Sequence, residues 1–321
     1  MGGASSDVRP ASGRQRQPCL HLLPQATSVT AASGAPAADR IDVLVVGGIG
    51  VDETVYLQRP LQPGSYTPVA APIRRTAAGS ATNVAVALSG AGLHTAISGA
   101  VGTDTDGDWL RRTLADADVR CHIAGVPGPS PRSLILVEPS GERTIIGLNN
   151  DLLEHAGTQM PAGAYSMLVV SSWRPQFHDL LQSSRTGGVC TVVGLRALTD
   201  PRVRADIAVG SRTELGGADP ADALDRFGTV VVTAAQHGAD VFTGADHTHV
   251  AAVEAKPVDA TGAGDAFLAG LVAGLAHGDG LGGALRLATT WGAAAVATPG
   301  ATAPPYHLVN RMCKGAPWPS T

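Results

Sequence analysis

The stretch Val258–Phe267 reads VDATGAGDAF and is followed by small and apolar residues as far as Ala276. The apolar run predicts a buried helix, and the glycines before it predict a loop that leads directly into that helix. The first amides of a helix have no partner within it, and the helix dipole gives them partial positive charge. We therefore expect the amides of Gly262, Ala263 and Gly264 to form an anion site that suits phosphate.

Asp265 is unusual beside such a site because a carboxylate repels phosphate. General base catalysis would explain it, since the carboxylate could take the proton from a hydroxyl group that attacks the phosphate. The alternative is that Thr261 or Asp265 only caps the helix. The catalytic interpretation requires the carboxylate to lie near polar side chains from the first third of the chain.

Length and composition limit the class of protein. The 321 residues allow one large α/β domain or two smaller ones. A net charge of −4 offers no basic surface, so we expect no nucleic acid partner. The four cysteines form no Cys-x-x-Cys pair and indicate no zinc site, which fits a reducing cytoplasm. The apolar run before Ala276 is shorter than the roughly 20 residues of a membrane span, so no membrane partner is expected.

The chain divides into regions of different composition. Residues 1–40 are rich in Ala, Ser, Gly, Pro and Gln and predict a disordered extension. From 41 to 310, β-branched strands alternate with small-residue helices, which predicts a three-layer α/β domain with a mainly parallel sheet. Segments at about 53–76 and 121–148 have the prolines and turns of edge strands and hairpins, and we expect them to form a small inserted β lid. Residues 311–321 are expected to be a tail.

The pattern Asp-x-Thr-Gly-Ala-Gly-Asp before a small-residue helix resembles the C-terminal signature of the ribokinase-like (PfkB) family of carbohydrate and nucleoside kinases. Weaker similarities extend the resemblance over about residues 41–305. It implies the ribokinase-like fold, ATP as the phosphate donor, and a sugar or nucleoside as the acceptor. It also implies that Asp265 is the catalytic base, that the amides of 262–264 form the anion hole, and that Asp259 lies near a monovalent cation such as K⁺. Relatives often dimerise through their lids, so a homodimer of that kind is implied as well.

The same resemblance assigns residues to the acceptor. Asp52 stands in a Gly-x-x-x-Asp turn after the first strand, where the family holds sugar hydroxyls. Gly79 and Asn83 stand in the family's Gly-Gly-x-x-x-Asn pattern, and the amide of Asn83 can both donate to and accept from a pair of hydroxyls. Asn83 as an ordinary helix cap is the alternative. Ala78 replaces the first glycine, and its methyl group could narrow the pocket. Arg143, in the expected hairpin, is either a substrate contact or a solvated turn residue.

Other positions resemble the nucleotide side of the family's site. Thr233 and Gly238 match the Thr-x-Gly-x-x-Gly turn, with Ala235 in place of a glycine. Thr261 and Gly264 of the central loop are expected to contact the nucleotide too. Glu214 matches the Asn-x-x-Glu pattern that organises Mg²⁺ and its waters in the family, a role that carboxylate oxygen suits. Ser211, shorter than the asparagine of the family, stands at the start of that pattern.

Three hypotheses about function follow. The favoured one is an ATP-dependent kinase that transfers the γ-phosphate to a hydroxymethyl group of a sugar or a sugar-containing small molecule. A nucleoside kinase of the same fold would be favoured if Trp173 stacked on a base, although Trp173 in the core is the alternative. The departures at Ala78, Ser211 and Ala235 leave a third hypothesis, a sugar- or nucleotide-binding protein with weak catalysis.

Overall fold

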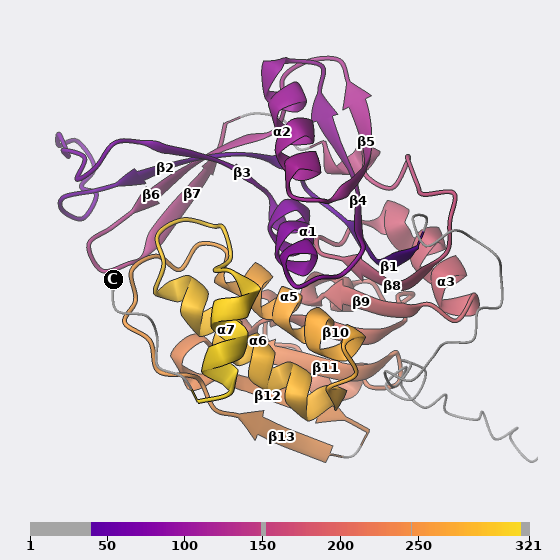
Figure 1. The fold of residues 1–321 in the computed structure, drawn as a ribbon. Coiled ribbons are helices and arrows are strands. Elements are labelled where there is room, and N and C mark those ends of the chain that lie inside the picture. Colours follow the sequence, from indigo (N-terminus) through magenta and orange to yellow (C-terminus); the bar gives the residue numbers. More distant parts are fainter. Residues whose placement is uncertain (1–39, 149–151, 245, 316–321) are drawn as a thin grey trace, which may run out of the picture.

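The computed structural model describes residues 40–148, 152–244 and 246–315, and within them two sheets lie side by side (Figure 1). The larger has nine strands in the order β13-β12-β11-β10-β9-β8-β1-β4-β5. Its strands are β1 (Ile41–Val46), β4 (Thr95–Gly102), β5 (Arg120–Val126), β8 (Tyr165–Val170), β9 (Cys190–Gly194), β10 (Ala205–Ser211), β11 (Phe227–Thr233), β12 (Ala239–Thr243) and β13 (Asp246–Val250). All neighbouring pairs from β11 to β5 are parallel, and only β12 and β13 pair antiparallel at one edge. The expected mainly parallel sheet is confirmed.

The second sheet is the lid sheet, with four strands in the order β3-β2-β6-β7. They are β2 (Gly50–Tyr56), β3 (Arg74–Ala78), β6 (Arg132–Val137) and β7 (Arg143–Gly147). The boundaries differ from those expected. Residues 121–126 belong to β5, which pairs with β4 in the large sheet, and the lid begins at Gly50 rather than near 53.

Helices cover both faces of the large sheet (Figure 1). They are α1 (Ser80–Gly90), α2 (Thr105–Asp116), α3 (His178–Thr186), the single turn α4 (Arg212–Leu215), α5 (Ala263–Ala276), α6 (Gly280–Val296) and α7 (Tyr306–Cys313). Because α7 runs to Cys313, regular structure continues past the expected domain end at 310. The expected N-terminal extension lies outside the described residues except for Arg40. In the described ranges no helix has both the length and the apolar character needed to cross a bilayer.

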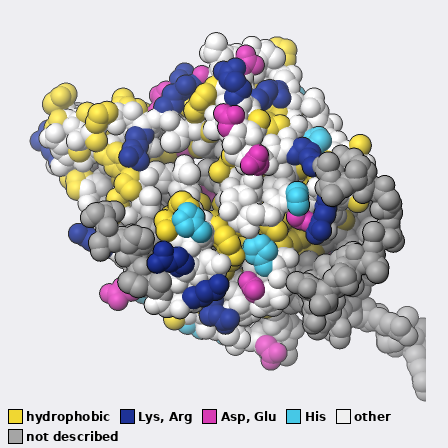
Figure 2. Space-filling view, in the orientation of Figure 1, with side chains coloured by type: hydrophobic (Ala, Val, Ile, Leu, Met, Phe, Trp, Pro, Cys, Tyr) yellow, Lys and Arg dark blue, Asp and Glu magenta, His cyan; other side chains and the backbone are white. Residues whose placement is uncertain are grey.

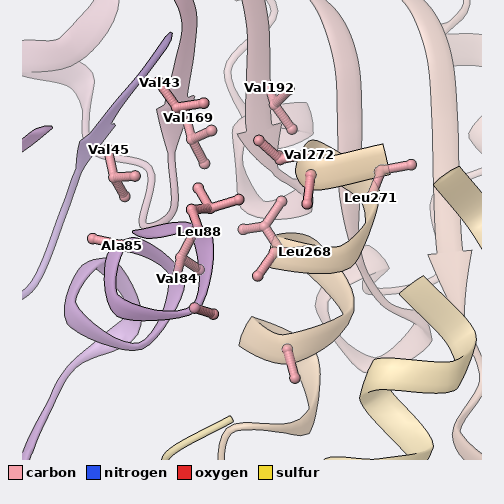
Figure 3. Packing of buried hydrophobic residues seen from close by; sticks show 14 of the residues in the cluster. Val43, Val45, Val84, Ala85, Leu88, Val169, Val192, Leu268, Leu271 and Val272 are labelled. Atoms are coloured by element: carbon pink, nitrogen blue, oxygen red, sulfur yellow. The ribbon is translucent and has the colours of Figure 1, made fainter. Parts of the chain in front are cut away.

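The core fixes α1 and α5 against the same face of the sheet (Figure 3). Val84, Ala85 and Leu88 of α1, and Leu268, Leu271 and Val272 of α5, meet valines of β1, β8 and β9. Leu44 and Val46 point to the opposite face, where a second cluster lies. Each fully buried Leu or Val side chain contributes roughly 1.5–3 kcal/mol. The two helices are therefore held firmly, and so are the residues at their N-terminal ends.

The topology indicates where a ligand would bind. The strand β1 has β4 on one side and β8 on the other, so the chain reverses its winding direction there. In open parallel sheets, ligands bind beyond the carboxyl ends of the strands at such a point. The chain passes from that end of β1 into the lid strand β2, and α1 follows β3. The candidate site is therefore the space between this edge of the large sheet and the lid sheet.

Candidate active site

The central loop has the geometry that an anion site requires. Gly262 is the residue before α5 and has φ 74°, a left-handed conformation that favours glycine. A Cβ atom at Gly262 would also clash with the carbonyl oxygen of Ala301. No side chain caps the helix, so the interpretation of Thr261 or Asp265 as a simple cap is wrong.

Two of the three expected amides are free to bind a ligand. The N–H groups of Gly262 and Gly264 donate no hydrogen bond to any residue in the described ranges, whereas Ala263 makes a long 3.4 Å contact with the carbonyl oxygen of Ala260. Gly264 is exposed, and Gly262 and Ala263 are half-buried. The loop thus presents donors, at the positive end of a buried helix, to an open site.

Asp265 lies beside Asn83, as the catalytic interpretation requires. The Nδ2 atom of Asn83 donates to Oδ2 of Asp265 over 2.7 Å, which joins α1 to α5. Asn83 is 9% exposed and stands inside α1, and its backbone N–H donates to the carbonyl oxygen of Gly79. Asn83 is therefore not a helix cap.

The surroundings of Asp265 make its carboxylate more basic than usual. Burial raises the pKa of Asp265 to about 6, although the hydrogen bond from Asn83 opposes the change. The negative charges of Asp52 and Glu214 raise this pKa further, and the positive charge of Arg143 lowers it. A carboxylate with a pKa near 6 is still mainly ionised at neutral pH and accepts a proton more readily than an ordinary one. Asp52, Glu214 and Arg143 are therefore each close enough to Asp265 to influence its charge.

Asp52 lies within the lid strand β2 and not in a turn. Burial raises the pKa of Asp52 to about 6. Within the described ranges its carboxylate accepts no hydrogen bond from the protein, so its oxygens can accept from the hydroxyls of a ligand.

Ala78 and Gly79 lie at the junction between β3 and α1. Gly79 precedes α1 with φ 97°, and a Cβ atom there would clash with the carbonyl of Gly48. Ala78 ends β3 and is completely buried. Because its methyl group is not accessible, Ala78 does not narrow an open pocket as expected.

A cluster of three serine hydroxyls was not expected. Ser80 Oγ donates to Ser171 Oγ over 2.8 Å and lies 2.9 Å from Ser172 Oγ. Ser80 precedes Asn83 by one turn of α1, so both side chains lie on the same face of that helix. Polar residues after β8 were visible in the sequence, but nothing local indicated that Ser80 meets them.

Trp173 belongs to the core. It is 6% exposed, and its ring centroid lies 6.5 Å from that of Phe177 in an edge-on arrangement. It therefore does not offer an open face to a nucleoside base, and the feature that would have favoured a nucleoside kinase is absent from the site.

Glu214 and Ser211 form a capping box at α4. Ser211 Oγ accepts from the Glu214 N–H over 3.3 Å, and Oε2 of Glu214 accepts from the Ser211 N–H over 2.8 Å. The described residues contain no group of three His, Cys, Asp or Glu side chains that could hold a metal. Mg²⁺, however, is usually bound through one or two carboxylates together with phosphates and waters. The carboxylate of Glu214 supplies oxygen ligands and lies close enough to Asp265 to influence its charge, so it fits that mode.

Thr233 ends β11, which pairs with the strand that leads to Glu214, and Gly238 directly precedes β12 in the turn between β11 and β12. Thr233 Oγ1 donates to the carbonyl of Gly210 over 3.2 Å, which fixes the ends of β10 and β11 together. Ala235 has φ 49°, so the turn keeps a conformation that glycine would adopt more easily.

Asp259 is the most completely bonded carboxylate of the loop. It is 0% exposed, and its Oδ1 accepts from the Thr261 N–H over 2.9 Å. Its Oδ2 accepts from the Tyr56 hydroxyl over 2.9 Å and from the Gly300 N–H over 3.0 Å. Burial opposes ionisation, but the bonds from Thr261, Gly300 and Tyr56 prevail and hold the pKa of Asp259 below its usual value. Three donors use most of the roughly four lone-pair positions of a carboxylate, so the expected monovalent cation fits poorly here.

The chain is similar to known carbohydrate kinases in sequence. A family model described as pfkB family carbohydrate kinase matches residues 51–307. An ATP-dependent ribose-1-phosphate kinase of Halopiger xanaduensis is 27% identical, over 83% of this chain and 95% of that protein. The bifunctional protein HldE of an Enterobacter species is 24% identical over 86% of this chain, which spans 64% of the length of that relative.

The solved structures agree with the fold. A microbiome-derived acarbose kinase has 25% sequence identity and a TM-score of 0.69, with 86% of this chain and 99% of that chain covered. A putative ribokinase from Agrobacterium tumefaciens has a TM-score of 0.75 at 21% identity, over 86% of this chain and 98% of that chain. The expected ribokinase-like fold is thereby confirmed.

Proposed function

The chain belongs to the pfkB family of carbohydrate kinases, ATP-dependent phosphotransferases that act on a sugar hydroxyl, and we propose that Asp265 is the catalytic base of that reaction here. The acceptor hydroxyl that fits this role best is a hydroxymethyl group of a sugar or a sugar-containing small molecule. The observation that carries the proposal is the contact of Asp265 with Asn83 beside the free amides of Gly262 and Gly264.

The reaction needs a proton acceptor and a site for the migrating phosphoryl group. Asp265 takes the proton from the attacking hydroxyl as the oxygen–phosphorus bond forms and the bond to the leaving ADP breaks. Its pKa of about 6 suits a base that works near neutral pH. The amides of Gly262 and Gly264, with that of Ala263, stabilise the negative charge on the transferred group. General base catalysis typically contributes about 10²- to 10⁴-fold and one anion-hole donor about 10²- to 10³-fold.

The acceptor is proposed to lie between α1 and the lid sheet. Asp52 on β2 and Asn83 on α1 bind its hydroxyls, and Gly79 shapes the start of α1. The serine hydroxyls at 80, 171 and 172 extend the polar surface one helical turn further from Asp265. These groups are uncharged, which suits the hydroxyl-rich part of a sugar.

The nucleotide is proposed to lie over the ends of β10 and β11. Thr233, Gly238, Thr261 and Gly264 would contact it, and Glu214 would hold Mg²⁺ through water. Bound Mg²⁺ supplies positive charge that neutralises the phosphates. Within the protein, Glu214 is oriented for that task by its capping bonds to Ser211. The cytoplasm, where ATP is available, is the proposed location.

The test is a coupled assay of ADP release over a panel of sugars and nucleosides. We expect turnover with at least one sugar and much weaker turnover with every nucleoside. The nucleoside kinase hypothesis would be supported by the reverse order. Calorimetric binding of sugar and ATP without any phosphorylated product would show instead a binding protein with weak catalysis.

A homodimer through the lid is proposed from its exposed apolar side chains. Ile73, Ile145 and Ile146 are exposed on or beside the lid strands, and Figure 2 shows apolar side chains gathered at that end of the molecule. Ile145→Lys should convert a dimer to a monomer in light scattering, and a wild-type protein that is already monomeric would contradict the proposal.

A further inference from the structure

The three hydrogen bonds to Asp259 come from three separate parts of the fold. Tyr56 is on the lid strand β2, Thr261 is in the central loop, and Gly300 is in the loop after α6. The carboxylate that joins them is completely buried. Because an ionised group without partners is costly in such a place, each of these bonds constrains the segment that donates it.

The segments joined at Asp259 also shape the anion site. Thr261 directly precedes Gly262, whose amide is one of the free donors. Gly300 directly precedes Ala301, whose carbonyl lies where a side chain of Gly262 would be. A shift of Asp259 would therefore move both the free amides and the backbone that packs against them.

Tyr56 connects this arrangement to the acceptor. Asp52 and Tyr56 stand four residues apart on β2, so their side chains point to the same side of the lid sheet. The carboxylate of Asp52 faces the proposed acceptor, and the hydroxyl of Tyr56 reaches the central loop. One strand thus carries both groups.

Two further contacts bring the lid to the same loops. Arg74 of β3 donates to the carbonyl of Pro299 over 3.4 Å, and a Cβ atom on Gly141, in the turn between β6 and β7, would lie 3.6 Å from the carbonyl oxygen of Val258. The hydrogen bond from Tyr56 is shorter than the one from Arg74, and its acceptor is ionised.

We infer that the hydroxyl of Tyr56 is a positioning group, which sets the anion hole at Gly262–Gly264 in its working geometry when the lid lies over the acceptor. Tyr56 acts through Asp259 and touches no reacting atom. The inference rests on the proposed function, because the anion hole is the feature that Tyr56 positions. This role explains why one of the hydrogen bonds to Asp259 comes from a hydroxyl group on the lid sheet.

The experiment compares Tyr56→Phe with wild type by calorimetry, with ADP and the β,γ-methylene analogue of ATP as probes in the presence of Mg²⁺. The phenylalanine variant removes only the hydroxyl group. A hydrogen bond to an ionised acceptor corresponds to about a tenfold change or more. We expect the affinity for the analogue to fall about tenfold, since its γ-phosphate needs the anion hole, while the affinity for ADP changes less than about twofold.

Tyr66→Phe is the matched control, because Tyr66 lies in the lid connection between β2 and β3 and is 82% exposed. It should leave both affinities and the melting temperature unchanged. Turnover with D-ribose and D-fructose should fall in Tyr56→Phe by the same factor as the affinity for the analogue. Equal affinities of Tyr56→Phe and wild type for the analogue would overturn the inference. So would a parallel loss of both affinities together with a lower melting temperature, which indicates a structural role only.

Failure of the proposed function would look different. In that case wild type would release no ADP with any sugar. The affinities of wild type and Tyr56→Phe for ADP and for the ATP analogue would still show whether Tyr56 positions the anion hole.

Discussion

Asp259 lies in the loop before α5, Asp265 lies in the first turn of that helix, and the two carboxylates have opposite properties. Asp259 is completely buried, accepts three hydrogen bonds and has a lowered pKa. Asp265 is half-buried, accepts one hydrogen bond from Asn83, and has its pKa raised to about 6. The same kind of side chain is thus stabilised in its ionised form at Asp259 and made more basic than usual at Asp265.

The difference comes from the partners of each carboxylate. Donors favour the ionised form, and Asp259 has enough of them to overcome its burial. Asp265 has one donor and two negative neighbours, Asp52 and Glu214, so burial prevails. In the proposed mechanism, Asp259 holds the shape of the loop, and Asp265 has fewer hydrogen-bond partners and acts as the base.

Replacement of Asp265 should have the largest effect. Asp265→Asn should lower kcat by about 10²- to 10⁴-fold while the affinities for sugar and ATP stay close to those of wild type. Its melting temperature should be equal or higher. A raised pKa means that ionised Asp265 costs stability above its ordinary pKa, and the neutral amide removes that cost. Steady-state kinetics, calorimetry and thermal melting test these points, and near-normal turnover would refute the assignment.

Replacement of the structural aspartate should have the opposite effect on stability. Asp259→Asn cannot accept all three hydrogen bonds, and each donor left unpaired costs about 1–3 kcal/mol. We expect the free energy of unfolding to fall by about 3 kcal/mol in urea denaturation at pH 7. In wild type, the stabilisation by Asp259 is complete above the ordinary pKa of an aspartate and is lost as the pH falls through its lowered pKa. If both asparagine variants changed stability in the same direction, the contrast between the two residues would be wrong.

Removal of the hydrogen bond from Asn83 to Asp265 should have a moderate effect. In Asn83→Leu the hydrogen bond that lowers the pKa of Asp265 is lost, so this pKa should rise above 6. The rising limb of the rate against pH should then move to higher pH, and kcat/KM at pH 7 should fall about tenfold, partly from weaker sugar binding. An unshifted limb would show that Asn83 does not tune the base.

Exchange of monovalent cations should have the smallest effect. Because donors from Tyr56, Thr261 and Gly300 occupy Asp259, replacing K⁺ by tetramethylammonium should change kcat less than about twofold. Strong activation by K⁺ would mean that Asp259 exchanges these donors for a cation.

The fold and the loop that leads into α5 could be predicted from sequence because their signals are local. The β-branched strands and small-residue helices repeat in order, and the residues from Gly262 to Asp265 are consecutive. Asn83 and Asp52 are far from Gly262–Asp265 in the sequence. Only the resemblance to a family predicted that these residues belong to one site.

What could not be predicted depends on side-chain direction and on contacts between distant segments. Tyr56 and Asp259 are far apart in the sequence but form a hydrogen bond, and no local sequence pattern predicts this contact. Trp173 follows a strand end like a ligand contact, but its ring turns into the core. Residues 121–126 have the composition of an edge strand whichever sheet they join, so the lid boundary became clear only from their pairing with β4.

The most direct test of Asp265 as the base is the dependence of kcat/KM on pH, measured from about pH 5 to about pH 8 in wild type and in Asp52→Asn. In wild type the rate should rise through about 6 and then level off, as Asp265 loses its proton in a titration coupled to that of Asp52. Loss of the negative charge of Asp52 should shift the limb to lower pH but keep it. A limb that disappears in Asp52→Asn, or one that persists in Asp265→Asn, would contradict the account.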